Sequence, residues 1–366
     1  MPMKRVLFLT NYPSPYRVRF FDELGKDLDV TVLFSNPPKV ATHRDAGWFE
    51  EGNGGFRGIQ LKKTLAVGRK CLCLNVVKYL KKDYDAIVVS GYSSPTAVLA
   101  MLYLRLRGIP FYMEVVGGLI RQERKIKYGM KKFLVTLAPR WLSTGAFTTD
   151  YLVHYGAKEE NVETYHFSSL CREDILEETV SSREKQALRK SLGIAEEKMI
   201  LAIAQFIHRK GFHVLLHAAR GLDGNVGIYI VGGEATEEYL RLRQELGLTN
   251  VHFLGFQKKD PLAKYYKAAD LFVLPTREDI WGLVINEAMA YGLGVITTDR
   301  CVAGLELVEA GVNGYIVPVE DVSALELAMK KALTGDTQAM GAASLEKIRP
   351  YTIEGMAQDH VQIFGR

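Results

Sequence analysis

The chain has 366 residues, 48% hydrophobic and 24% charged, which is enough for two globular domains, each with its own core. Its longest apolar stretches, such as residues 95–104, fall well short of the ~20 residues of a membrane-spanning helix. The apolar run at residues 6–9 is shorter than the roughly 7–15 residues of a signal-peptide core. The four cysteines lack the spacing of a zinc site, which favours reduced thiols in a cytoplasmic protein.

Charge is divided unevenly along the chain. Residues 1–175 hold 26 Lys and Arg against 17 Asp and Glu, whereas the remainder holds 21 against 25. A basic first half is typical of a domain that meets an anionic partner, such as a membrane surface, a phosphorylated acceptor or a nucleic acid. A protein with an uneven surface and no such partner is the alternative. No nucleic-acid-binding motif is present, so we expect no nucleic-acid partner.

The first half predicts an α/β domain with a parallel sheet, because short apolar runs alternate with helical patterns. Gly108 and Pro110 end one helix and lead into the next strand. The expected strands are 5–9, 30–34, 86–90, 111–115 and 146–148, and the clearest helices are 16–28 and 95–107.

The second half repeats this pattern, with expected strands at 199–204, 227–231, 251–254, 271–274, 294–297 and 314–317. Residues 166–198 show no strand pattern, and we place a linker near residues 168–180. The expected organisation is an N-terminal Rossmann-like domain over 1–170, a second over 171–350, and a C-terminal helix at 351–366 that returns to the first domain. Ligands of such sheets bind at the carboxyl ends of the strands, so we expect the site in the cleft between the domains.

The segment 274–292 carries the strongest motif. A strand ends at Pro275, a polar turn follows, and a helix begins near Gly282. Free N–H groups at a helix start bind anions, and a glycine there lets a phosphate approach closely. Asp279 precedes the helix and Glu287 follows eight residues later, so the two carboxylates can address the sugar and the ribose of a nucleotide sugar.

This segment resembles the Glu-x7-Glu signature of retaining glycosyltransferases with the GT-B fold, in the large bacterial family four. The flanking words 270–275, 288–292 and 313–314 match as well. The resemblance implies donor contacts at Gly282, Leu283, Val284 and Glu287. The family's first Glu falls on Asp279 here, while Glu278 is one place out of register, so either the shorter acid reaches the sugar or the donor differs. A helix with solvated acids is the alternative interpretation.

A second resemblance lies in residues 203–212, which are similar to the family's Gly-Arg-x4-Lys-Gly loop, whose cations neutralise the diphosphate leaving group. Lys210 and Gly211 match, Ala204 and Gln205 replace the Gly-Arg pair, and Arg209 restores a charge. Fixed cations at a leaving group favour metal-independent transfer. A surface Arg-Lys pair is the alternative.

Two further loops follow strands in this half, at Gly232-Gly233 and at residues 252–256. In the family such loops bracket the nucleotide base. Phe256 is expected to stack on the base, and a packed loop aromatic is the alternative.

The first strand leads into a proline-rich loop over residues 11–17 instead of Gly-x-Gly-x-x-Gly, which argues against a dehydrogenase. We expect this loop to present Ser14, Tyr16 and Arg17 on the acceptor side.

A second acceptor-side loop follows the strand at 111–115 and contains Gly117. Many family members have His or Asp where Val116 stands. Glu114 lies on the same side of the strand and is the candidate catalytic substitute. A buried, paired acid is the alternative.

Residues 119–135 interleave apolar residues with cations that include Arg124, Lys125, Lys131 and Lys132. A basic amphipathic stretch suits anionic lipid headgroups or a lipid-diphosphate acceptor. A solvated helix face is the alternative.

The sequence as a whole therefore predicts a metal-independent retaining GT-B hexosyltransferase in cell-surface polysaccharide or glycolipid synthesis. Its donor is a nucleoside-diphosphate sugar, expected to be a UDP-sugar, with no other cofactor. Its acceptor is a glycan or a lipid-linked glycan. We expect it in the cytoplasm, peripheral to the inner face of the cell membrane. A non-catalytic nucleotide-sugar-binding protein and a GT-B nucleotide-sugar epimerase are the alternatives.

Overall fold

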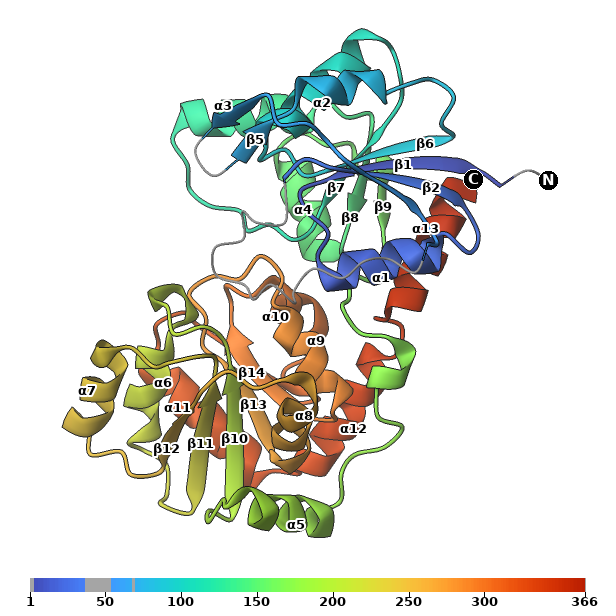
Figure 1. Cartoon of the computed structure of the whole chain (residues 1–366). Coiled ribbons are helices and arrows are strands. Elements are labelled where there is room, and N and C mark those ends of the chain that lie inside the picture. Colours follow the sequence, from blue (N-terminus) through green and yellow to red (C-terminus); the bar gives the residue numbers. More distant parts are fainter. Residues whose placement is uncertain (1–2, 37–53, 68–69, 366) are drawn as a thin grey trace. The chain divides into compact units, whose positions relative to one another are not determined.

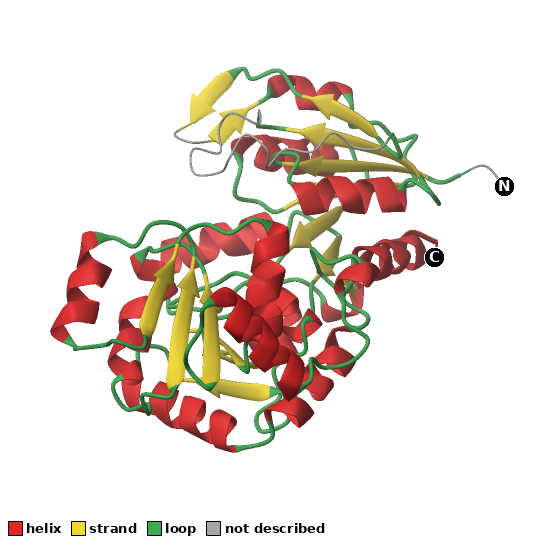
Figure 2. Ribbon diagram, turned by 60° about the horizontal axis from the view of Figure 1, so that its bottom comes forward, coloured by secondary structure: helices red, strands yellow, loops and turns green. Residues whose placement is uncertain are grey.

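The computed structural model describes residues 3–36, 54–67 and 70–365, and the chain divides into two compact units. Unit 1 comprises residues 1–171 and 351–366, and unit 2 comprises residues 172–350. Each unit is a parallel sheet with helices on both faces (Figures 1 and 2). The unit boundary falls within the linker that the sequence suggests at residues 168–180.

Unit 1 has a seven-stranded parallel sheet in the order β3-β2-β1-β6-β7-β8-β9. A separate antiparallel hairpin pairs β4 with β5. The strands are β1 (Arg5–Thr10), β2 (Asp29–Phe34), β3 (Arg57–Gln60), β4 (Leu65–Val67), β5 (Lys70–Leu72), β6 (Ala86–Ser90), β7 (Tyr112–Val115), β8 (Arg140–Ser143) and β9 (Val162–Thr164).

Both faces of this sheet are buried, because alternate side chains of each strand point to opposite faces. Leu7 and Leu9 join the core on the side of α2, whereas Phe8 packs on Phe21 of α1 and on Phe364 of α13. Helix α13 therefore belongs to unit 1, beside α1 (Figure 1). The helices are α1 (Pro15–Leu24), α2 (Pro95–Leu106), α3 (Lys125–Val135), α4 (Ala146–His154) and α13 (Ile353–Gly365).

Unit 2 has a six-stranded parallel sheet in the order β12-β11-β10-β13-β14-β15. The strands are β10 (Lys198–Ile203), β11 (Val226–Val231), β12 (Val251–Leu254), β13 (Leu271–Leu274), β14 (Gly294–Thr298) and β15 (Gly314–Val317). The helices are α5 (Ser182–Leu192), α6 (Phe212–Ala219), α7 (Glu237–Glu245), α8 (Lys259–Ala268), α9 (Leu283–Ala290), α10 (Val302–Leu307), α11 (Val322–Thr334) and α12 (Thr337–Ile348).

The expected strand at 146–148 is wrong, because these residues open helix α4 and the strand lies earlier, in β8. The hydroxyls in this stretch bond locally: Thr149 Oγ1 donates to Gly145 O at 3.0 Å, and the Thr144 and Thr148 hydroxyls lie 2.8 Å apart. Such local bonds let threonines, which favour strands, enter the first turn of a helix.

Candidate functional site

The strand order of unit 2 reverses between β10 and β13, which are neighbours in the sheet although β13 begins 73 residues after β10. A sheet of this kind binds ligands at such a reversal, outside the carboxyl ends of the strands. The loops after these two strands therefore form the candidate site.

These two loops contact each other through backbone and side chains. Arg277 N donates to Arg209 O at 2.8 Å, and Thr276 Oγ1 donates to the same oxygen at 3.1 Å. Gly211 lies against Pro275, where an added Cβ would come within 2.0 Å of the carbonyl oxygen. Since Gly211 also has a φ of +70°, only glycine fits the junction without strain.

An ion pair joins the two loops at the centre of the site. Lys210 Nζ donates to Asp279 Oδ2, and both side chains are largely buried. Arg209 Nη1 lies 3.8 Å from Asp279 Oδ1 and donates to Glu278 O at 2.6 Å. The structure thus brings together the three charged residues that the two motifs supplied separately, with two cations around one carboxylate.

The start of α9 is shaped for close approach of a ligand to the backbone. Gly282 is the N-cap residue, with a φ of +103°, and no side chain caps the helix. Leu283 and Val284 follow in the first turn and are half-buried. The first N–H groups of a helix lack partners within the helix, so this turn offers donors to an anion.

Glu287 lies farther along α9 and accepts a hydrogen bond from the Tyr266 hydroxyl at 2.9 Å. The Tyr266 ring stacks on Tyr291, with centroids 4.8 Å apart. Burial raises the pKa of Glu287 above its ordinary value, Asp174 adds to this effect, and the hydrogen bond from Tyr266 opposes it. In the ligand-free protein, ionisation of the hydrogen-bond acceptor Glu287 therefore costs folding stability.

Phe256 follows β12, at the same edge of the sheet. Its side chain is 71% exposed, so the alternative of a packed loop aromatic does not describe it. An exposed ring of this kind presents a face on which a planar group can stack.

A second charged cluster, which no sequence motif marks, lies beside the ion pair. Arg277 Nε donates to Glu320 Oε1 at 2.5 Å and its Nη2 lies 3.2 Å from His213 Nε2. The His208 and His213 rings stack with centroids 5.6 Å apart. The hydrogen bond from Arg277 is the main cause that lowers the pKa of Glu320 to about 2. Only the proximity of the two histidines to Arg209-Lys210 hinted at this cluster.

In unit 1, Glu114 at the end of β7 is only 4% exposed. It accepts hydrogen bonds from Ser90 Oγ at 2.5 Å and Tyr165 Oη at 3.0 Å, and it pairs with Arg17 Nη1 at 3.3 Å. Burial alone raises its pKa, but Arg17 and the hydrogen bonds hold that pKa below the ordinary value. This placement corrects the expectation of a catalytic Glu114 and matches its alternative, the buried and paired acid.

The other expected acceptor-side residues are only partly open. Ser14 is buried before α1, and the Tyr16 ring packs edge-on against Phe167. Val116 is half-buried, and Gly117 has a φ of +74° in the loop after β7. Arg17 pairs with Glu114, so these two sequence-predicted residues of unit 1 form a buried ion pair.

Within residues 3–36, 54–67 and 70–365, no group of three or more His, Cys, Asp and Glu is placed to hold a metal ion. No helix in the same ranges is long and apolar enough to span a bilayer.

Comparison with known proteins shows what unit 2 is similar to. Residues 184–349, which contain the whole candidate site of unit 2, match the model of glycosyl transferases group 1. The chain is 30% identical over 194 residues to an uncharacterised glycosyltransferase of Methanocaldococcus jannaschii, covering 50% of this chain and 49% of that protein. It is also 30% identical over 200 residues to the D-inositol 3-phosphate glycosyltransferase of Corynebacterium urealyticum, covering 50% and 47%. The matched regions thus span about half the length of these curated relatives.

The fold of the whole chain is similar to solved structures. HepE of Anabaena, solved in complex with UDP, superimposes with a TM-score of 0.75 at 18% identity, covering 99% of this chain and 100% of that one. At this identity the likeness shows the fold, two parallel α/β units of the GT-B type. Residues 184–349 are therefore similar to the glycosyl transferases group 1 family, and the whole chain shares the fold of these solved structures.

Proposed function

We propose that the protein transfers a hexose from a nucleoside-diphosphate sugar to a hydroxyl group, with retention of configuration and without a metal ion. The Lys210–Asp279 ion pair carries this proposal, because it fixes a cation at the strand reversal where the sheet binds its ligand. A UDP-sugar is the proposed donor, in keeping with the UDP complex of the HepE neighbour.

Each side chain of the site has a proposed role toward that donor. Lys210 and Arg209 neutralise the diphosphate, the first turn of α9 donates N–H groups to it, and Glu287 accepts hydrogen bonds from the ribose hydroxyls. Phe256 stacks on the base. Asp279 positions Lys210 and lies where it can accept hydrogen bonds from the sugar.

In the proposed reaction, the bond between the anomeric carbon and the diphosphate oxygen breaks while the acceptor oxygen bonds to that carbon. The hydroxyl proton passes to an oxygen of the leaving diphosphate, so the protein supplies no base. Negative charge on the diphosphate grows as the bond breaks, and a fixed cation favours that state over the ground state.

The proposed acceptor is a glycan or a lipid-linked glycan of the cell surface, met at the inner face of the cell membrane. The basic composition of residues 1–175 supports an anionic environment for unit 1.

A thermal-shift screen of UDP-, GDP-, ADP- and dTDP-sugars tests the donor site. A ligand at 100 times its dissociation constant stabilises the folded state by about 2.7 kcal/mol. We expect one nucleotide class to raise the Tm, and no increase with any of them contradicts the proposal. Binding without hydrolysis or transfer indicates a nucleotide-sugar-binding protein instead.

A further inference from the structure

Helix α3 of unit 1 exposes three large apolar side chains. Ile126, Met130 and Phe133 are 89%, 56% and 54% exposed. They are spaced four and three residues apart, which places them in one stripe along the helix. Apolar residues exposed singly are common, but a continuous stripe on one helix face is a typical interaction surface.

Lysines border this stripe on both sides. By helical periodicity, Lys125 and Lys132 lie along one border and Lys127 along the other. Lys125 and Lys132 are exposed and form no ion pair with any of the described residues. Lys127 pairs with Glu123 at 3.1 Å yet stays 57% exposed.

The structure corrects the set of cations expected from the sequence. Lys131 Nζ lies 2.7 Å from Glu123 Oε1 and over the Tyr155 ring, and its side chain is only 16% exposed. It therefore fastens α3 to the rest of unit 1. The apolar stripe and the free cations lie on a helix that is anchored by its opposite side.

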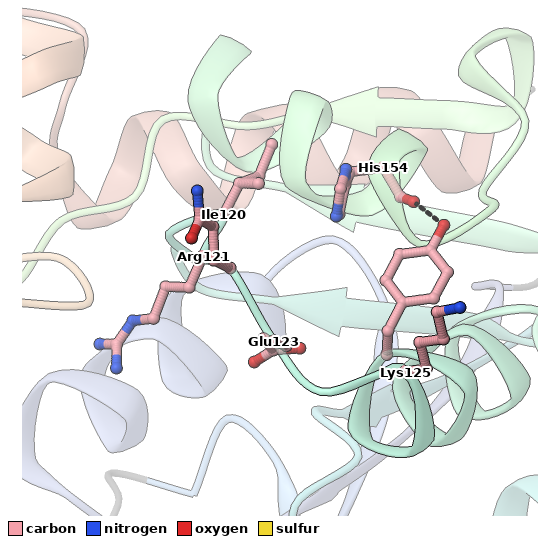
Figure 3. Close-up of a pocket in the computed structure, with 7 residues that line it drawn as sticks. Ile120, Arg121, Glu123, Lys125 and His154 are labelled. Atoms are coloured by element: carbon pink, nitrogen blue, oxygen red, sulfur yellow. Dashed lines mark hydrogen bonds between the residues drawn. The ribbon is translucent and has the colours of Figure 1, made fainter.

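An open cavity of about 710 Å³ adjoins the N-terminal end of the helix. Figure 3 shows Arg121 and Glu123 on the loop that leads into α3, with Lys125 in its first turn. The dashed line is the hydrogen bond from the Tyr128 hydroxyl to His154 O, 3.1 Å long. Lys125 lines both this cavity and the border of the stripe.

We infer that α3 lies in the surface of an anionic bilayer, with Ile126, Met130 and Phe133 inserted among the lipids and the bordering lysines on the headgroups. An amphipathic helix with an apolar face and basic borders binds in this way. Charge complementarity and the apolar stripe together favour the lipid surface as occupant. Residues 1–175 carry 26 Lys and Arg against 17 Asp and Glu, and a bilayer also offers an apolar interior to the exposed stripe. The surface would deliver a lipid-linked acceptor, and that role alone rests on the proposed function.

Vesicle sedimentation at low salt tests the inference on the full chain. The probes are phosphatidylcholine vesicles with and without an equal part of phosphatidylglycerol. We expect binding to the anionic vesicles alone, and a loss of binding in Met130→Asp/Phe133→Asp. Lys125→Glu/Lys132→Glu should weaken partitioning at least 25-fold, about fivefold for each lysine, since one cation contributes about 1 kcal/mol at an anionic surface.

Matched controls separate this surface from general effects. Leu327→Asp changes an apolar side chain that is 67% exposed on α11 of unit 2, and Lys62→Glu/Lys63→Glu changes two exposed cations elsewhere in unit 1. Both controls should bind the vesicles like the wild type. Phe133→Trp should show a blue-shifted emission on anionic vesicles that Leu327→Trp lacks.

Wild-type protein that ignores anionic vesicles at low salt overturns the inference, as does equal loss of binding in the control variants. The nucleotide-induced Tm increase is measured on every variant and should persist. The substitutions in α3 and at Lys62 and Lys63 lie outside unit 2, and Leu327 is an exposed residue of α11 that is not part of the candidate site. Vesicle binding without any nucleotide-induced increase leaves the docking surface standing and refutes the donor site.

Discussion

Glu287→Gln should weaken nucleotide binding while stabilising the ligand-free protein. The substitution keeps the shape of the side chain and removes its charge. One hydrogen bond to a charged acceptor contributes about 1.5–3 kcal/mol, and the Gln carbonyl still accepts one neutral bond. We therefore expect the dissociation constant of the nucleoside diphosphate to rise about 10- to 150-fold, at 1.4 kcal/mol for each factor of ten.

The stability effect has the opposite sign because burial raises the pKa of Glu287. When folding raises the pKa of a carboxyl, the folded protein loses stability as the pH rises from the unfolded-state pKa through the folded-state pKa. At neutral pH the wild type carries this cost and the Gln variant does not. The Tm of Glu287→Gln should exceed that of the wild type at pH 7, and the difference should shrink toward pH 4.

Isothermal titration with the nucleotide and its 2′,3′-dideoxy analogue checks the assignment to ribose. The wild type should prefer the ribonucleotide strongly, and the Gln variant should bind the two almost alike. Tyr266→Phe, which removes only the donor to Glu287, should keep most of the preference. Equal discrimination by wild type and Glu287→Gln would refute the ribose contact.

Three further predictions concern the loops and unit 1. Lys210→Ala should lower turnover at saturating nucleotide sugar by about 100-fold or more, as the loss of one group that stabilises developing charge does. Arg209→Ala should lower turnover less. Full rates in both variants would place leaving-group stabilisation elsewhere. Gly211→Ala should reduce both the Tm and nucleotide binding, because its Cβ would lie 2.0 Å from a backbone oxygen. The control Gly193→Ala has the same φ of +70° but lies in open space, so it should lose only about 1–2 kcal/mol of stability for the left-handed conformation. Equal losses in the two variants would show that the contact is unimportant. Glu114→Gln should destabilise unit 1 by about 3–5 kcal/mol, since it leaves a buried guanidinium unpaired. The wild type should lose stability as the pH falls through the lowered pKa of Glu114, and the Gln variant should not show this pH dependence. An unchanged denaturant midpoint would contradict the pairing.

The sheets were predictable where apolar runs are long. The runs 199–203 and 294–297 are buried on both faces, and a continuous apolar run of this length is typical of a parallel strand. The short strand β8 was not predictable in this way, because Arg140 begins it and the threonine-rich stretch after it has the composition of a strand. The threonine-rich stretch instead begins helix α4, where its hydroxyls form local hydrogen bonds.

The site was predictable in its residues but only partly in its contacts. Lys210 and Asp279 emerge from separate motifs 69 residues apart, and their pairing depends on β10 and β13 being neighbours. The burial of Glu114 depends on Arg17 and Tyr165, which come from other elements of unit 1. The Arg277–Glu320 contact spans 43 residues, and no local pattern marks it.

The donor site built around Lys210 is tested most directly by measuring the release of nucleoside diphosphate. The substrate is the nucleotide sugar that gives the largest Tm increase. The account predicts turnover by the wild type, a loss of about 100-fold or more in Lys210→Ala, and full activity in Lys330→Ala, whose lysine pairs with Glu326 on α11. Bare nucleotide should raise the Tm of all three proteins, and the increase should be smaller in Lys210→Ala only by the loss of one contact to the diphosphate. No turnover by the wild type, or equal turnover by the wild type and Lys210→Ala, would contradict it.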